Sequence, residues 1–388
     1  MAVLAYTARS AACERGPTMQ TTRNHALDMA KVFATCFILF HHYQMVGVMV
    51  TGQTMPGPSF YSSAVQPEDF SWGYVVELFF LISGFVMLPY LQKIRQGLTF
   101  YQFYTRRAAR LLPLLALSGA VCAAVLVVYD KAYQTSFWAG DPSLFGVVLH
   151  ALGIQAGWGF ADPYLNSATW YCSVLLLCCL LFFAVVYWSG RLGVSPFYGL
   201  VFLMFLGCAG QTFHTQLPLL DNGASRGYSA FFAGVVLAAL WPLLQKWRGT
   251  PWVCLVLLAA AGAELYKNGG RMPYMPFPLT FLVYPALLFL LQQPPCSAVS
   301  RLPLWEGLAR ISYSVYLWHI PFYILLYSIA KLLGQDPAVL VCLPGMLLSA
   351  AALWGIGWVS YRCLERPLNQ KALAWFAALD PARQPEHV

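Results

Sequence analysis

Charged residues are the scarcest feature of this sequence. Asp, Glu, Lys and Arg together make up 10% of the 388 residues, whereas about 25% is usual for a soluble domain. A soluble chain of this size could not cover its surface with so few charges. This scarcity excludes a soluble globular enzyme, a disordered protein and a disulfide-rich secreted domain.

Several motifs that carry chemistry are also missing from the sequence. There is no phosphate-binding P-loop, no dinucleotide glycine fingerprint and no HExxH zinc motif. No basic patch interleaved with aromatics favours nucleic-acid binding. The 11 cysteines include no CxxC pair and lie mostly in apolar runs, so we expect small buried side chains. We therefore predict neither a metal site nor a nucleic-acid partner.

Apolar sequence is abundant, at 59% of the residues, with a mean hydropathy of +0.60. A membrane-spanning helix needs about 20 largely apolar residues. The sequence therefore predicts an all-α, polytopic membrane bundle of about ten transmembrane helices. The expected spans are 27–48, 72–91, 110–129, 168–188, 195–212, 227–245, 252–267, 277–292, 311–331 and 338–361.

The excess of positive charge, +8, indicates how the bundle is oriented. With ten spans, most Lys and Arg residues fall in loops on one side, which the positive-inside rule assigns to the cytoplasm. We expect both termini to be cytoplasmic, in a multi-pass protein of the cell inner (plasma) membrane. The short, glycine-interrupted apolar stretch 143–158 is expected to be external or re-entrant.

Three regions are expected along the chain. Residues 1–22 are predicted to be a disordered tail or a start-site artefact, with Met19 as an alternative start. Residues 23–370 are the membrane domain, and 371–388 a cytoplasmic tail.

Ionisable residues inside spans are costly, so each one is a candidate functional residue. In the first span, Lys31 and His42 are eleven residues apart, hence within about 20° of one helix stripe and about 16 Å apart along the axis. Asp28 and Thr35 lie near the same stripe, whereas His41 points elsewhere. The alternatives are a helix–helix hydrogen bond and a lysine that snorkels to the interface.

Further polar residues lie in or beside later spans. Glu77 stands in an apolar helix beside Ser83-Gly84, a pair that permits close helix contact. It is a candidate to orient a histidine or a hydroxyl, or else a buried acid with a partner in the bundle. Arg107 and Arg110 share one helix face and suit a phosphate-rich ligand, although composition alone favours topogenic charge or lipid headgroup contact.

In the ninth span, Ser312, Tyr316, His319 and Tyr323 form one helical stripe, and Pro321 is expected to kink the helix just beyond it. This stripe is a candidate cavity wall, or His319 is a hydrogen-bonded core residue.

Three features outside these stripes have simpler explanations. Arg226 begins the sixth span and is interpreted as an arginine that snorkels to the membrane interface. Trp170 and Tyr171 begin the fourth span and fit an aromatic belt. Glu365 and Arg366 are expected to form an interfacial ion pair.

Together these stretches resemble the acyltransferase-3 family of integral membrane O-acyltransferases. The likeness rests on five segments in order: Asp28 to His42, ELFFLISGF from Glu77, Arg107 to Arg110, SYSVYLWHIP from Ser312, and Glu365-Arg366-Pro367. Lys31 stands where Arg is usual, Met29 where Gly is usual, and Glu77 where Asp is common. The fourth span lacks the acidic residue of one subgroup.

The resemblance implies acyltransferase activity, with cytoplasmic acyl-CoA, usually acetyl-CoA, as donor and a hydroxyl as acceptor. Acceptors of the family are cell-envelope glycans, lipid-linked sugars or small natural products. Arg107, Arg110 and Lys31 are expected to bind acyl-CoA. The predicted catalytic residues are His42, as general base or transient acyl carrier, with Lys31 and Glu77. The residues expected along the acceptor path are Asp28, Arg226, Tyr316 and His319.

The main alternative is a multi-pass transporter or flippase of a lipid-linked sugar, without acyl transfer. Intramembrane His and Glu fit that function equally well, but it requires no RxxR pair at the cytoplasmic face. A second alternative is an unrelated membrane acyltransferase with a single histidine, which the SYSVYLWH and ERP segments disfavour. A purely structural scaffold gains nothing from costly buried polar groups.

Overall fold

The computed structural model describes residues 24–57, 59–61, 71–137, 142–160, 165–270, 272, 274–294 and 296–380. Within these ranges the protein is a helical bundle with no strand. The predicted N-terminal tail and the last eight residues lie outside the described residues.

Among the described residues, seven helical stretches are long and apolar enough to cross a membrane. They are α2 (His25–Thr51), η2–α3–α4 (Trp72–Tyr74, Val75–Phe85 and Leu88–Arg95), α5 (Phe100–Tyr133), η3–α7 (Ser167–Thr169 and Trp170–Arg191), α9 (Asn222–Lys246), α14 (Pro303–Leu332) and α15–η6–α16 (Leu343–Ser360, Tyr361–Glu365 and Arg366–Ala378).

Shorter helices lie at the remaining predicted spans, so the count of ten is not confirmed. They are α8 (Pro196–Thr212), α10 (Thr250–Lys267) and α11–η4–α12 (Pro276–Pro278, Leu279–Val283 and Tyr284–Leu290). The stretch expected to be external or re-entrant holds α6 (Leu144–Leu152), whose nine residues extend only about 14 Å. Two further short helices are α13 (Cys296–Ser300) and η5 (Pro337–Leu340).

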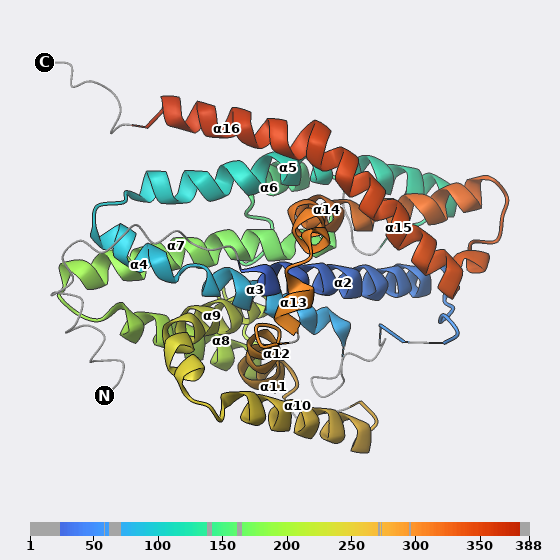
Figure 1. Ribbon diagram of the computed structural model, residues 1–388. Helices are drawn as coiled ribbons and strands as arrows, with labels where there is room; N and C mark the ends of the chain where they lie inside the picture. The colour runs from blue at the N-terminus through green and yellow to red at the C-terminus, as the bar shows by residue number, and fades with distance from the viewer. Residues whose placement is uncertain are drawn as a thin grey trace, which may run out of the picture.

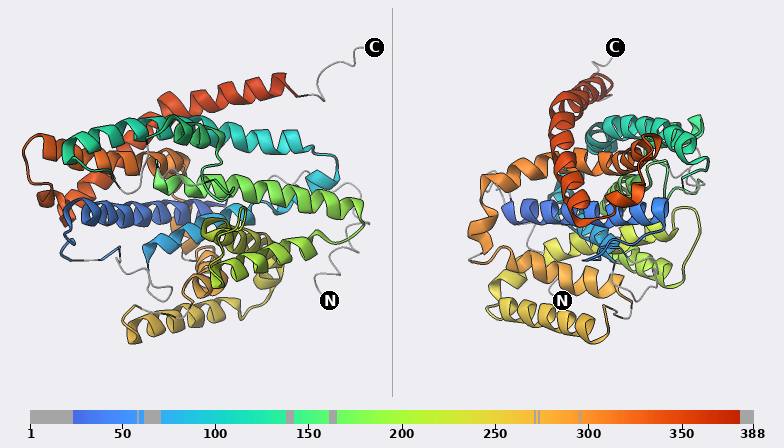
Figure 2. Two further views of the ribbon diagram at one scale, coloured as in Figure 1. Left: turned by 180° about the vertical axis from the view of Figure 1, so that it is seen from behind. Right: turned by 90° about the vertical axis from the view of Figure 1, so that its right-hand side faces the viewer.

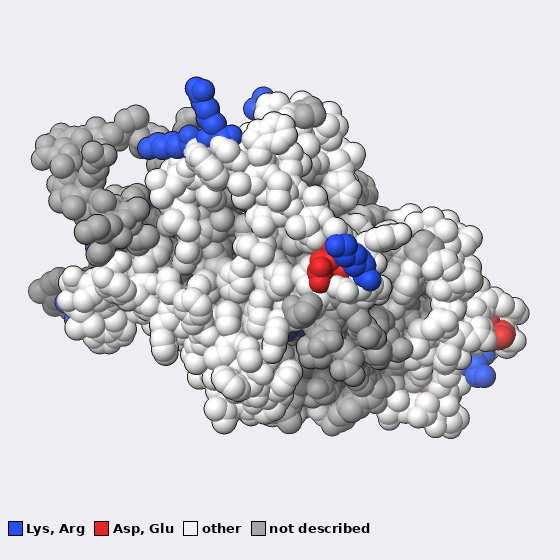
Figure 3. Space-filling model, turned by 90° about the horizontal axis from the view of Figure 1, so that it is seen from below, with Lys and Arg blue, Asp and Glu red and all other residues white. Residues whose placement is uncertain are grey.

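Helix α2 lies in the middle of the bundle, with α10 and α16 along opposite outer edges (Figures 1 and 2). Asn24 caps its first turn by accepting a hydrogen bond from the Leu27 amide, and Gly52 ends it in a left-handed conformation. Helices α3, α14 and α15 pack against α2. One face of the surface carries few charged side chains (Figure 3), as expected of a surface in lipid.

Two glycines bring α3 and α9 into backbone contact. A Cβ on Gly84 would lie 1.8 Å from the Phe231 carbonyl oxygen, and one on Gly234 would lie 2.0 Å from the Leu81 carbonyl oxygen. The close approach predicted at Ser83-Gly84 is therefore present. This contact also fixes how α3 and α9 are placed along each other, and so which of their polar residues meet.

Candidate functional site

A cavity of about 220 Å³ lies among α2, α3, α5, α7 and α14. Cations gather at one part of its wall, and tyrosine, serine and apolar side chains form the rest. The residues that line it are Lys31, Thr35, Val76, Phe79, Ile82, Ser83, Val86, Met87, Arg107, Arg110, Leu111, Tyr171, Leu175, Cys179, Phe231, Ala309, Ser312, Tyr313 and Tyr316.

The structure brings together the three cations that the sequence singled out as acyl-CoA ligands, because Lys31, Arg107 and Arg110 all line this cavity. The Arg107 guanidinium lies over the Phe103 ring, 3.6 Å from its centroid, and donates to the Phe103 carbonyl at 2.6 Å. Arg110 is exposed and makes no hydrogen bond or ion pair to a described residue. The Arg107 guanidinium is thus held in place, whereas the Arg110 guanidinium can bind an anion.

Two histidines from helices far apart in the sequence form a pair. His42 of α2 and His319 of α14 approach with Nδ1 of His42 3.0 Å from Nε2 of His319. His42 Nδ1 also lies 3.1 Å from the Ile38 carbonyl oxygen. His319 is fully buried, and its Nδ1 hydrogen-bonds the Tyr316 carbonyl oxygen.

These partners decide where the protons of the neutral pair lie. A carbonyl only accepts, so His319 Nδ1 carries a hydrogen and its Nε2 presents a lone pair. Both neighbours of His42 Nδ1 are then acceptors, so this nitrogen is also protonated. The lone pair of His42 is left on Nε2, the nitrogen able to take a proton or bond to carbon.

Tyr316 connects the cavity to the histidine pair. Its side chain lines the cavity, and its ring centroid lies 5.5 Å from that of His319. His319 is one turn further along α14 than Tyr316, and His42 is two turns further along α2 than the lining residue Thr35. The histidine pair therefore lies just beyond the cavity, on the side away from Lys31.

Comparison with known families identifies the family of this chain. A family model described as an acyltransferase domain, acyltransferase 3, matches residues 24–358, which is most of the chain. The chain belongs to this acyltransferase family. It is therefore an acyltransferase, and its apolar helices make it a multi-pass membrane protein. No curated protein and no solved structure matches it.

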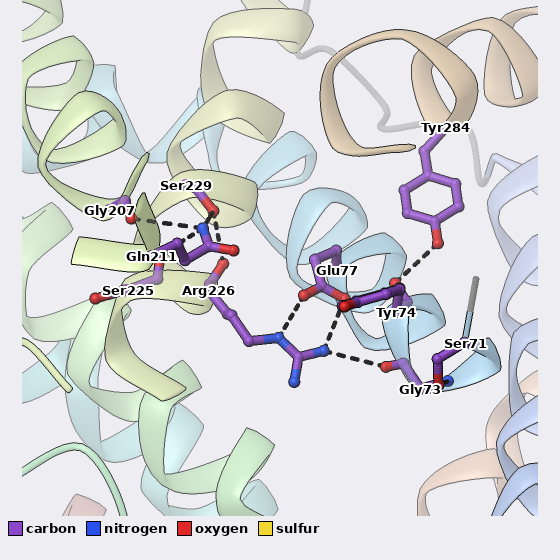
Figure 4. A network of polar contacts seen from close by, with 10 residues as sticks. All are labelled: Ser71, Gly73, Tyr74, Glu77, Gly207, Gln211, Ser225, Arg226, Ser229 and Tyr284. Atoms are coloured by element: carbon purple, nitrogen blue, oxygen red, sulfur yellow. Dashed lines mark hydrogen bonds and ion pairs between the residues drawn. The ribbon is translucent and has the colours of Figure 1, made fainter. Parts of the chain in front are cut away.

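In this acyltransferase, Glu77 pairs with Arg226 rather than with a histidine (Figure 4). Arg226 Nε lies 2.5 Å from Glu77 Oε1, and one of its terminal nitrogens lies 3.1 Å from Oε2. The same guanidinium donates to the Gly73 carbonyl at 3.2 Å and lies over the Trp170 ring. Glu77 is 1% exposed. The pair joins α3 to α9 about two helical turns from the contacts of Gly84 and Gly234.

The predicted acceptor path is thus divided among three places. His319 adjoins His42 and Tyr316 adjoins His319, whereas Arg226 is held by Glu77. Asp28 is buried in the first turn of α2, three residues before Lys31, and does not line the cavity. The structure does not bring Asp28 to the histidine pair.

His41 does not line the cavity, although its ring centroid lies 5.0 Å from that of His42. Its Nδ1 lies 3.0 Å from the Phe60 carbonyl oxygen, and its ring touches Tyr61. A Cβ on Gly73 would lie 3.3 Å from His41 Nε2, so His41 borders the network of Glu77 and Arg226.

Sequence reasoning missed two tyrosines of the cavity wall, Tyr171 and Tyr313. Tyr171, interpreted as part of an aromatic belt, lines the cavity and hydrogen-bonds Ser83 across it at 3.0 Å. Its place in a Trp-Tyr pair at a helix start resembles an interfacial anchor, so no local signal marked it.

The ion pair expected between Glu365 and Arg366 is not formed among the described residues. Glu365 is buried and accepts a 2.6 Å hydrogen bond from Ser314, while Arg366 is exposed. The π-helical turn Tyr361–Glu365 aims the carboxylate inward, and there it interacts electrostatically with Arg110.

Proposed function

We propose that this acyltransferase moves an acyl group, most simply acetyl, from acyl-CoA to a hydroxyl of a cell-envelope glycan, lipid-linked sugar or small natural product. Acyl-CoA would enter from the cytoplasm. Arg107, Arg110 and Lys31 would bind its phosphates, because guanidinium groups match phosphate geometry.

One observation carries the proposal: a single cavity has the arginine pair in its wall and reaches the tyrosine that touches the histidine pair. A phosphate-bearing donor bound by the arginines could then extend its thioester towards His42 along the cavity. A lipid-linked sugar transporter needs no such link between cations and histidines.

The reaction would use the lone pair of His42 Nε2. This nitrogen takes the proton of the acceptor hydroxyl while the hydroxyl oxygen bonds to the thioester carbonyl carbon. The carbon–sulfur bond then breaks, and the imidazolium returns the proton to the departing CoA thiolate. His319 is fully buried, which limits the access of water to the pair, so hydrolysis of the thioester would compete poorly.

Turnover by purified protein in nanodiscs tests this assignment. With labelled acetyl-CoA and envelope extract as the source of acceptor, His42→Ala should lower acyl transfer by about 10²–10⁴-fold. His41→Ala, the matched control on the neighbouring position, should remain active. Full activity in His42→Ala with loss in His41→Ala would refute the assigned base.

A second measurement separates base from carrier. If His42 carries the acyl group, labelled protein accumulates in the absence of acceptor. If it acts as a base, no label stays on the protein, and CoA release requires acceptor.

A further inference from the structure

A proline breaks the hydrogen bonding of α14 just beyond the histidine. Pro321 lies inside this helix and has no N–H to donate. In a regular helix that N–H would bond to the carbonyl four residues earlier, which is that of Leu317. The Leu317 carbonyl is therefore left without its helical donor.

Asn166, from the segment that precedes α7, donates to this carbonyl instead. Its Nδ2 lies 3.0 Å from the Leu317 carbonyl oxygen, and the side chain is 1% exposed. A second bond ties the same two segments, since the Tyr316 hydroxyl donates to the Ala168 carbonyl. Two consecutive residues of α14 are thus attached to one short turn.

The turn that holds them is itself well anchored. Thr169 donates to the Asn166 carbonyl at 2.7 Å, and Gln155 donates to the Thr169 carbonyl at 3.0 Å. Thr169 and Gln155 are both buried. The Cys122 thiol donates to the Leu165 carbonyl at 2.8 Å. The turn can therefore act as a fixed support for α14.

The anchored residues set the state of His319. The Tyr316 carbonyl accepts from His319 Nδ1 and so selects the tautomer that leaves the lone pair of Nε2 facing His42. If the turn of Tyr316 and Leu317 moves, this carbonyl moves with it, and His319 can instead donate from Nε2. His42 Nδ1 would then accept, and the proton of His42 would shift to Nε2.

We infer that Asn166 is a positioning residue for acyl transfer: it replaces the hydrogen bond that Pro321 removes and so keeps Nε2 of His42 unprotonated. This inference rests on the proposed role of His42. Asn166 touches neither histidine and acts through the backbone of α14.

A double-mutant cycle tests the inference. Asn166→Leu, close in size but without a donor, should lower kcat by about 10²-fold, the loss expected from a small misplacement. It should leave KM for acetyl-CoA within about twofold, because neither Asn166 nor α14 supplies the cations expected to bind the donor. Pro321→Ala restores a helical N–H for the Leu317 carbonyl. In that background Asn166→Leu should lower kcat by less than about threefold, since the two changes share one partner.

Ser328→Ala is the matched control, because it removes a buried hydrogen bond within α14, to the Ile324 carbonyl, that involves neither Leu317 nor the turn of Asn166. It should keep kcat within about threefold. The inference would be overturned if Asn166→Leu lowered kcat equally in both backgrounds. It would also be overturned if Asn166→Leu changed KM for acetyl-CoA but not kcat.

Nitrogen-15 NMR of histidine-labelled protein gives a readout that does not need turnover. Wild type should show His319 protonated on Nδ1, and Asn166→Leu should show a shift towards Nε2 protonation that Pro321→Ala reverses. An unchanged tautomer in Asn166→Leu counts against the inference. The proposed function has its own test, because it fails if His42→Ala stays active. The NMR result for Asn166→Leu does not depend on that activity, so the two failures can be distinguished.

Discussion

Arg110 is the residue through which donor binding can be measured most directly. Arg110→Ala removes an exposed cation of the cavity wall that makes no hydrogen bond to a described residue. We expect the affinity for acetyl-CoA to fall by about tenfold or more, as for a lost charge-assisted hydrogen bond. Isothermal titration in detergent measures this, with dephospho-CoA as a ligand that has fewer phosphates.

Arg106→Ala is the control for Arg110→Ala, because Arg106 is exposed and does not line the cavity. Equal affinity for acetyl-CoA in the Arg110→Ala and wild-type proteins would reject the phosphate assignment.

The pair of Glu77 and Arg226 gives a second prediction for single residues. Glu77→Ala leaves a guanidinium without its buried carboxylate, which costs about 3–5 kcal/mol of unfolding free energy. The thermal unfolding temperature in detergent should fall markedly. Glu306→Ala, which breaks the exposed pair of Glu306 and Arg310 on α14, should change it little.

Glu77→Gln separates a structural role of Glu77 from the predicted catalytic one. The amide keeps the shape of the side chain and can still accept from Arg226. If Glu77 is structural, folded Glu77→Gln protein should transfer acyl groups at near the wild-type rate. A stable but inactive variant would restore Glu77 to the catalytic set.

The sequence identifies candidate residues more readily than their roles, because a role depends on which residues are in contact. Helical spacing marked His42 and His319 separately, because each lies on a polar stripe of its own helix. Their contact joins positions 277 apart in the chain, and no spacing within one helix can reveal it. The partner of Glu77 was hidden for the same reason.

At the scale of helices, the crossing of α3 and α9 depends on glycine. Gly84→Ala would place a Cβ 1.8 Å from a backbone oxygen of α9, and backbone cannot move aside as a flexible side chain can. We expect a loss of about 1–3 kcal/mol in unfolding free energy, and reduced activity because Arg226 shifts relative to Glu77.

Gly262→Ala is the control for this crossing, since a Cβ at this position of α10 meets nothing within 4 Å. It should be neutral or stabilise the protein by up to about 1 kcal/mol. A thermal shift assay that ranks the two alanine variants equally would contradict the close crossing.

Two helices extend beyond the apolar runs from which they were predicted. α5 begins at Phe100, ten residues before its expected span, and the last helix continues through α16 to Ala378. Tyr101 of α5 donates to the Phe376 carbonyl of α16 at 2.8 Å. Hydropathy detects only the part of a helix in lipid, so polar extensions held by such contacts escape it.

For the whole molecule, the orientation in the membrane remains a prediction with a clear test. The Arg95 side chain at the end of α4 reaches the Val194 carbonyl at 3.4 Å, so the loops after α4 and after α7 lie together. The positive-inside rule places both in the cytoplasm. Cysteines introduced at Gln96 and Leu192 should escape an impermeant maleimide in spheroplasts and react in inverted vesicles.

Tyr266, near the end of α10 and 90% exposed, is the matched position for the opposite side. Tyr266→Cys should react in spheroplasts, with Cys363→Ser as the background because Cys363 is exposed. Labelling of all three positions from the same side would refute the orientation.

The sequence by itself determined the class of this protein and its chemistry. A chain so poor in charge must lie in lipid, and any polar residue kept there points to function because of its cost. Only the tertiary structure decided which of those residues work together: Glu77 with Arg226, His42 with His319, and Asn166 with the carbonyl freed by Pro321. Hydropathy is a property of each helix alone, whereas hydrogen bonds between helices depend on their register and rotation, which are set by packing.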